Sequence, residues 1–238
     1  MTHIVAGYPN MDKCKSLAKL MDKCGVSFIE IQIPFSDPVA DGSTIMAANQ
    51  KALENGVKVK DCFQLMKHLS SEVGTPLLFM SYFNILHSFG VEAFCKKAKE
   101  CGCYGLIVPD IPFDEEDHEG YLAACKKHGL KAIQIVSPIT SDKRLKQISK
   151  VADGFVYCVS RFGTTGEKTD LNLKLKGYLK RVKRFVDLPL AVGFGISNKK
   201  HVDLVNESAE IAVIGSKILN VLEKKGFKGV ESFLKSVV

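Results

Sequence analysis

The sequence contains no apolar run that approaches the about 18 residues needed by a membrane-spanning helix. Met1 leads directly into the segment THIVAG, without the basic region and apolar stretch of a secretory signal. The chain also has no low-complexity segment and no linker that would divide it. These absences predict a cytoplasmic protein in which residues 1–238 form one domain.

Metal-binding and disulfide patterns are missing as well. None of the eight cysteines belongs to a CxxC motif, and no histidine cluster completes a zinc site. Cys101 and Cys103 are too close in the sequence for an ordinary disulfide. We therefore expect reduced thiols, as is typical of cytosolic proteins, and no bound metal.

The charge balance is basic, with 33 lysine and arginine residues against 26 acidic residues and a net charge of +7. The lysines are scattered as pairs along expected helices, without the aromatic or arginine pattern of nucleic-acid-binding proteins. A solvated, lysine-rich surface is the simpler interpretation. The alternative is that the positive field attracts a small anionic substrate.

Eight short apolar segments recur along the chain and alternate with segments of helical periodicity. The expected strands cover residues 2–7, 27–33, 76–81, 104–110, 131–137, 154–160, 188–193 and 210–215. Two helices, around 44–55 and 59–71, are expected after the second strand. This alternation predicts an α/β protein with a parallel sheet, and eight units favour a closed (β/α)8 TIM barrel. An open, doubly wound sheet is the alternative.

The second expected strand, SFIEIQI, carries a glutamate between isoleucines. Because side chains alternate along a strand, Ile29, Ile31 and Ile33 share one face, and Glu30 and Gln32 share the other. The isoleucines suit the outer face, which packs on helices, so Glu30 points into the barrel near its top. A buried carboxylate there suits acid/base catalysis, and a structural glutamate paired with a lysine or hydroxyl has the same pattern.

Loops that contain glycine follow the last three expected strands. They lie in the segments YCVSRFGTTG, VGFGIS and VIGSKIL. Glycine lets the backbone approach a ligand closely, and the loops after strands seven and eight of such barrels commonly bind phosphate. The three loops together predict a phosphorylated substrate.

The loop PFSDPVADG follows the second strand and carries two prolines and two aspartates. Together with the strand before it, IEIQIPFSDPVADG resembles the ELGxPFSDPxADG signature of the tryptophan synthase α subunit. Further segments match motifs of that family in the same order, namely FMSYFNIL, VPDIPFDEE, VSRFGTTG, VGFGIS and VIGSKI. The resemblance therefore covers nearly the whole chain.

This resemblance implies a lyase that cleaves indole-3-glycerol phosphate to indole and glyceraldehyde 3-phosphate by a retro-aldol reaction. Glu30 matches the family's acid/base glutamate, and Asp41 matches the aspartate that holds the indole N–H. Tyr157 matches a tyrosine near the glutamate. The positions that match substrate- or phosphate-binding residues are Thr165, Gly166, Phe194, Gly195, Ile196, Gly215 and Ser216.

The resemblance also implies a partner. The family works as an α2β2 complex in which pyridoxal phosphate belongs to the β subunit, so no cofactor is expected in this chain. Asp37 and Pro38 match the loop that contacts β, and Asn84 and Asp110 match positions at or near the same interface. Neither a nucleic acid nor a membrane is expected as a partner.

The chain departs from the family pattern in several places. The family's helix before the first strand has no counterpart ahead of THIVAG, and Gln32 stands where the family has glycine. Ser43, Phe162 and Thr164 also differ. Gln32 adds bulk beside Glu30, which predicts crowding of the substrate or an altered Glu30. Two alternatives therefore stay open: a catalytically weak α-like subunit that mainly activates β, and a free-standing indole lyase.

Overall fold

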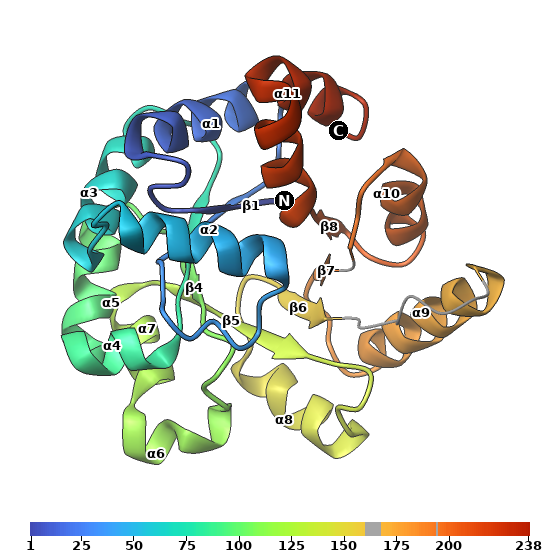
Figure 1. Cartoon of the computed structure of the whole chain (residues 1–238). Coiled ribbons are helices and arrows are strands. Elements are labelled where there is room, and N and C mark those ends of the chain that lie inside the picture. Colours follow the sequence, from blue (N-terminus) through green and yellow to red (C-terminus); the bar gives the residue numbers. More distant parts are fainter. Residues whose placement is uncertain (160–167, 194) are drawn as a thin grey trace.

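The computed structural model describes residues 1–159, 168–193 and 195–238. Eight strands pair in parallel in the order of the chain, as Figure 1 shows. The strands are β1 (Thr2–Val5), β2 (Ile29–Gln32), β3 (Leu77–Met80), β4 (Gly105–Ile107), β5 (Lys131–Val136), β6 (Val156–Val159), β7 (Leu190–Gly193) and β8 (Ile211–Val213). All eight were predicted, and each is shorter than expected.

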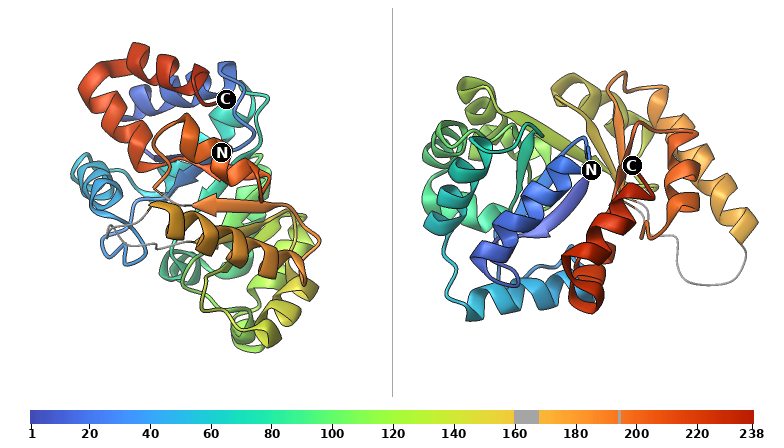
Figure 2. Two further views of the ribbon diagram at one scale, coloured as in Figure 1. Left: turned by 90° about the vertical axis from the view of Figure 1, so that its right-hand side faces the viewer. Right: turned by 90° about the horizontal axis from the view of Figure 1, so that it is seen from above.

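Helices surround the strands (Figures 1 and 2). They are α1 (Met11–Lys23), α2 (Ser43–Glu54), α3 (Val59–Ser70), α4 (Phe83–Phe89), α5 (Val91–Glu100), the 3-10 helix η1 (Phe113–Glu115), α6 (Glu116–Glu119), α7 (Tyr121–His128), α8 (Asp142–Val151), α9 (Lys168–Lys183), α10 (Lys199–Asn206) and α11 (Ser216–Lys235). The two helices after β2 were predicted, whereas α4, η1 and α6 were not. A distant residue supports α4, because Asp110 Oδ1 accepts a hydrogen bond from the N–H of Phe83 at 2.8 Å.

The sheet closes on itself between β8 and β1. A parallel bridge pairs Thr2 with Ile214. The N–H of His3 donates to the carbonyl of Ile214 at 3.0 Å, and the N–H of Ile214 donates to the carbonyl of Met1 at 3.0 Å. Closure pairs the two edges of the sheet, so the chain forms a (β/α)8 TIM barrel and the open-sheet alternative is wrong.

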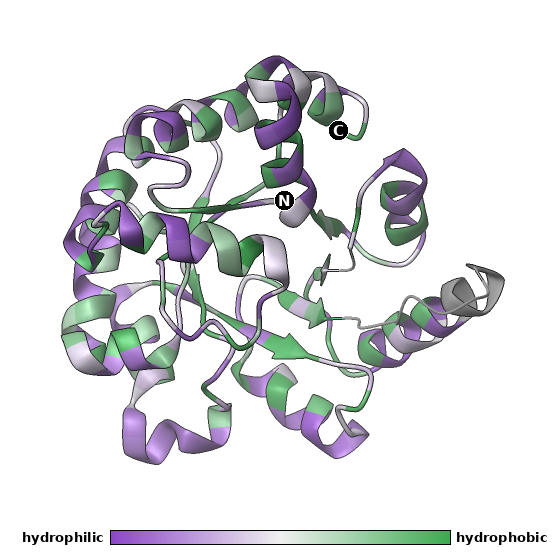
Figure 3. Ribbon diagram, in the orientation of Figure 1, coloured by the Kyte–Doolittle hydropathy of each residue, from purple (hydrophilic) through white to green (hydrophobic). Residues whose placement is uncertain are grey.

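The alternation predicted for β2 is confirmed. Ile29, Ile31 and Ile33 pack in the large core between the barrel and its helices. A separate cluster fills the inside of the barrel, with Leu78, Met80, Ile107, Ile133, Ala191 and Val213 among its members. Figure 3 shows the same division, with hydrophobic residues along the strands and hydrophilic residues on the outside of the helices.

Three aromatic rings fill the end of the barrel at which the strands begin. Phe28, Tyr104 and Phe155 each precede a strand, and the three strands are the alternate ones β2, β4 and β6. The ring of Phe28 lies 5.6 Å from that of Tyr104 and 5.3 Å from that of Phe155. Layers contributed by alternate strands are typical of such barrels. This layer closes one end of the interior and leaves the other end for a site.

Two further findings bear on the sequence predictions. All eight cysteines are free thiols, as expected. Among the helices of the described residues, none is both long and apolar enough to cross a membrane.

The aromatic layer should contribute to the free energy of unfolding. Replacing Phe155, which is 1% exposed, by alanine leaves a cavity inside the barrel. We expect the Phe155→Ala variant to lose about 3–5 kcal/mol of unfolding free energy in urea or thermal denaturation. The control is Ile139→Ala, at a side chain that is 94% exposed, and it should change stability by less than about 0.5 kcal/mol. Equal stability of the two variants would contradict a packed interior.

Candidate active site

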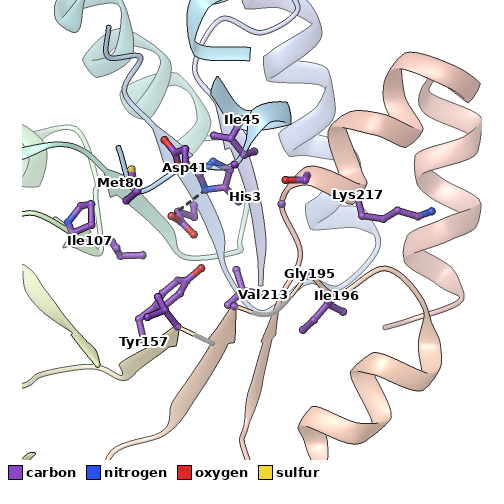
Figure 4. Close-up of a pocket in the computed structure, with 18 of the residues that line it drawn as sticks. His3, Asp41, Ile45, Met80, Ile107, Tyr157, Gly195, Ile196, Val213 and Lys217 are labelled. Atoms are coloured by element: carbon purple, nitrogen blue, oxygen red, sulfur yellow. Dashed lines mark ion pairs between the residues drawn. The ribbon is translucent and has the colours of Figure 1, made fainter. Parts of the chain in front are cut away.

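A cavity of about 500 Å³ opens at the end of the barrel where the strands finish. Its walls come from most of the barrel. Residues of β1, β2, β6, β7 and α11 line it together with the loop after β2, as the close-up in Figure 4 shows. This is the end at which barrels of this kind place their active sites.

Glu30 is the buried carboxylate of this cavity. The parallel register puts it between His3 of β1 and Leu78 of β3, and it is only 3% exposed. Its Oε1 lies 3.0 Å from Nδ1 of His3, while its Oε2 has no hydrogen-bond partner among the described residues. A buried polar atom without a partner is costly, so Oε2 is available to a bound molecule.

Asp41 reaches the same cavity from the loop after β2. Its Oδ2 accepts a hydrogen bond from Nε2 of Gln32 at 2.7 Å and another from the hydroxyl of Tyr82 at 3.1 Å. Burial raises the pKa of Asp41, and the donors Gln32 and Tyr82, together with His3, offset part of that effect. The two carboxylates therefore sit in different surroundings.

Gln32 has a defined partner in the structure. The side chain is fully buried, and its amide supports Asp41. The sequence predicted that Gln32 lies beside Glu30 and crowds the substrate or alters Glu30. The structure shows in addition that Nε2 of Gln32 donates to Oδ2 of Asp41.

The loop that carries Asp41 is held by groups outside it. The hydroxyl of Tyr82 accepts a hydrogen bond from the N–H of Ala40 at 3.0 Å. The ring of Phe35 stacks on Tyr82 at 5.1 Å between centroids, and the N–H of Phe35 donates to Oδ1 of Asn49 at 3.0 Å. These contacts fix both ends of the loop over the cavity.

Tyr157 projects from β6 into the cavity (Figure 4). Burial, together with the carboxylates Glu30 and Asp41, raises the pKa of Tyr157 well above its ordinary value. The phenol therefore stays neutral and can act as a hydrogen-bond donor. A side chain on Gly193 of β7 would come within 2.7 Å of the Tyr157 hydroxyl, so a glycine is needed beside it.

The start of α11 and the loop after β7 form a wall of the cavity whose backbone suits an anion. Gly215 and Ser216 open the 20-residue helix α11 and line the cavity. The first N–H groups of a helix have no partner within it, and the helix dipole favours a negative charge there. Gly195, at φ +45°, and Ile196 lie across from them. The arrangement suits a phosphate group.

Most of the predicted catalytic and substrate-binding residues come together. Those that line the cavity are Glu30, Asp41, Tyr157, Gly195, Ile196, Gly215 and Ser216. Thr165, Gly166 and Phe194 lie outside the described residues, as do Phe162 and Thr164. No group of three or more histidine, cysteine, aspartate or glutamate side chains that could hold a metal ion occurs in the described part of the chain.

The residues predicted for a partner lie outside the cavity. Asp37, Asn84 and Asp110 are exposed, whereas Pro38 is buried in this chain. Burial raises the pKa of Asp110, and its hydrogen bond from Phe83 offsets part of that effect. This bond also places Asp110 next to Asn84 on the surface.

Sequence reasoning missed several residues of the site. Polar residues among them include His3, Ser197, Lys217 and Asn220, which line the cavity, and Tyr82, which holds Asp41. A signal for His3 was present, because a histidine stands in the otherwise apolar strand THIVAG. Tyr82 lies in the segment FMSYFNIL, which matches a family motif, but its contact with Asp41 depends on which loops meet at the cavity. No local pattern marks Asn220, because its place depends on how α11 meets the barrel.

Known proteins share this sequence and fold. Residues 1–236 match the family model described as "Tryptophan synthase alpha chain". The tryptophan synthase alpha chain of Syntrophotalea carbinolica is 43% identical over 237 residues, which is 100% of this chain and 93% of that protein.

Solved structures agree. The tryptophan synthase subunit alpha of Legionella pneumophila superposes with a TM-score of 0.91 at 30% identity, covering 99% of this chain and 89% of the other. A structure of tryptophan synthase from M. tuberculosis gives a TM-score of 0.90 at 28% identity, with coverage of 99% and 89%. The sequence, the barrel and these relatives lead to one conclusion: the chain belongs to the tryptophan synthase alpha chain family.

Proposed function

We propose that this one domain, residues 1–238, cleaves indole-3-glycerol phosphate with Glu30 and Asp41 as its catalytic carboxylates. As a member of its family the chain is a lyase that forms indole and glyceraldehyde 3-phosphate. The observation that carries the proposal is the meeting of these two carboxylates with the start of α11 in one cavity.

The geometry suggests how the reaction proceeds. Glu30 gives a proton to C3 of the indole ring and takes one from the hydroxyl on the adjacent carbon of the side chain. The bond between C3 and that carbon breaks, its electron pair returns to the ring, and the hydroxyl carbon becomes the aldehyde. Asp41 accepts the indole N–H and stabilises the positive charge of the protonated ring. Tyr157, a neutral donor, lies beside Glu30.

The phosphate of the substrate fits the other side of the cavity. Gly215 and Ser216 present backbone N–H groups at the start of α11, and Gly195 and Ile196 complete the wall. Thr165, Gly166 and Phe194 stay predictions for this subsite and for the indole pocket. The family's α chain needs no cofactor for this reaction, and pyridoxal phosphate belongs to the β subunit.

The setting and the partner are further parts of the proposal. Eight free cysteines support a reducing compartment, as in the cytoplasm. The chain assembles with a tryptophan synthase β subunit as α2β2, and the exposed Asp37, Asn84 and Asp110 are the surface positions that would contact it. Pro38 is buried, so its contact with β requires the loop after β2 to move.

The proposed roles of the two carboxylates predict the effect of neutralising each of them. Glu30→Gln and Asp41→Asn keep the shape of each side chain and remove its charge. Each variant should lower kcat for indole release from indole-3-glycerol phosphate at least about a hundredfold, because general acid–base and electrostatic stabilisation are lost. The control is Glu54→Gln, the same change on the exposed face of α2. Turnover near the wild-type rate in both active-site variants would contradict the assignment.

Substitutions of Gln32 distinguish the proposed lyase from a weakly catalytic α-like subunit that mainly activates β. Its hydrogen bond to Asp41 indicates a supporting role in cleavage. Gln32→Met, which keeps the volume and removes the donor, should lower kcat about ten- to a hundredfold, as expected for a lost bond to a charged group. Gln32→Gly should do the same. Faster indole release by Gln32→Gly would favour the weakly catalytic activator instead.

The partner is tested by binding. Mixed with a tryptophan synthase β subunit at micromolar concentration, the chain should elute as a larger complex in size-exclusion chromatography. Alanine in place of Asp37 or Asn84 should weaken that complex, with at least one substitution costing more than about 1 kcal/mol in titration calorimetry. Wild-type chain that elutes alone would favour the free-standing lyase.

A further inference from the structure

His3 lies against the catalytic glutamate from the neighbouring strand. The register of β1 and β2 pairs the two residues directly, and Nδ1 of His3 is 3.0 Å from Oε1 of Glu30. Both side chains are buried, at 7% and 3% exposed. Gly215 closes the other side, since a side chain there would meet Cβ of His3 at 3.3 Å. The imidazole therefore has a fixed place in the wall of the cavity (Figure 4).

The groups around His3 favour its charged form. Burial on its own lowers the pKa of His3, but Glu30, Asp41 and the Gln32 amide outweigh burial and raise that pKa above the ordinary value. Tyr157 faces the same carboxylates from β6 as a neutral phenol. Burial lowers the pKa of the Met1 amino group, and the charge of Glu30 offsets part of that effect. This amino group donates to the carbonyl of Ala212 at 2.9 Å.

The lysine that lines the cavity is not paired with Glu30. Lys217, at the start of α11, lines the cavity, but its ammonium lies over the ring of Phe233 at 5.7 Å and the side chain points away from His3 (Figure 4). Nε2 of His3 has no hydrogen-bond partner among the described residues. Among the side chains that line the cavity, the imidazole is thus the cation placed against Glu30.

We propose that His3 is a positioning residue for Glu30, in which Nδ1–H holds Oε1 and the imidazolium charge stabilises the carboxylate, leaving Oε2 to exchange the proton with the substrate. This inference rests on the proposed function. The two oxygens of Glu30 differ as it requires: Oε1 faces the imidazole, and Oε2 is buried without a partner in the described structure.

The pair explains how one carboxylate can serve two proton transfers. After Glu30 has protonated C3 of the indole ring, it carries a negative charge in a buried site. A cation at hydrogen-bond distance stabilises that charge until the hydroxyl proton arrives and restores the acid. His3 keeps its own proton throughout, so the protons balance between Glu30 and the substrate alone.

Two substitutions separate the hydrogen bond from the charge. His3→Phe keeps a ring and removes both, whereas His3→Asn keeps an amide N–H close to the place of Nδ1 and removes only the charge. His3→Phe should lower kcat about ten- to a hundredfold with little change in KM. His3→Asn should recover part of that loss. The matched control is His68→Phe, at a surface histidine on α3.

The pH profile gives a readout that a merely structural role would not move. In the wild-type chain, kcat/KM should fall at alkaline pH as His3 loses its proton, and this limb should be absent from both His3 variants. Unchanged kcat and an unchanged profile in folded His3→Phe and His3→Asn would overturn the proposal.

A titration by NMR keeps the test independent of turnover. With labelled histidines, the signal that disappears in His3→Phe should titrate above the ordinary value of about 6.5 and move downward in Glu30→Gln. A His3 signal that titrates at the ordinary value, with the same pKa in Glu30→Gln, overturns the proposal. This result counts even if His3→Phe fails to fold. Absence of indole from the wild-type chain contradicts the proposed function instead, and the titration still decides on the pair.

Discussion

The site depends on the closure of the barrel between β8 and β1. The hydrogen bonds that join Met1 and His3 to Ile214 set the edge of β1 against the end of β8. The same bonds bring His3 beside Gly215 on one side, while the register with β2 brings it beside Glu30 on the other. One strand pairing thus joins Glu30, the proposed acid/base residue, to the start of α11. An open sheet would separate Glu30 from the proposed phosphate subsite.

Different surroundings suit the two carboxylates to the different roles that we propose for them. Glu30 sits inside the barrel against His3, and its Oε2 has no hydrogen-bond partner among the described residues. Asp41 sits on a loop, where Gln32 and Tyr82 both donate to its Oδ2. Paired acids with contrasting environments are a common way to divide proton transfer from charge stabilisation. In this chain the contrast comes from neutral donors on Asp41 and a histidine beside Glu30.

The sequence predicted those features that depend on local pattern. The eight strands, their parallel order and the inward direction of Glu30 follow from short apolar runs and from alternation along SFIEIQI. The glycine-containing loop that leads into α11 was predicted from the segment VIGSKIL. The family motifs then gave Asp41 and Tyr157 their expected roles, and both residues line the cavity.

The remaining features depend on contacts between distant segments. The sequence did not show that Gln32 donates a hydrogen bond to Asp41. Asp41 comes from a loop whose shape is set by Tyr82, a residue beyond β3. His3 was overlooked because its importance rests on the register between two strands. Helix α4 escaped prediction for the same reason, since Asp110 supports its first turn from another loop.

The proposed reaction breaks the bond between the indole ring and its glycerol phosphate side chain in this cavity. The most direct measurement follows both products from purified wild-type chain and indole-3-glycerol phosphate, with and without a β subunit. We expect equal amounts of indole and glyceraldehyde 3-phosphate from the chain alone, formed faster when β is present. A folded chain that releases neither product under either condition would contradict the proposed reaction.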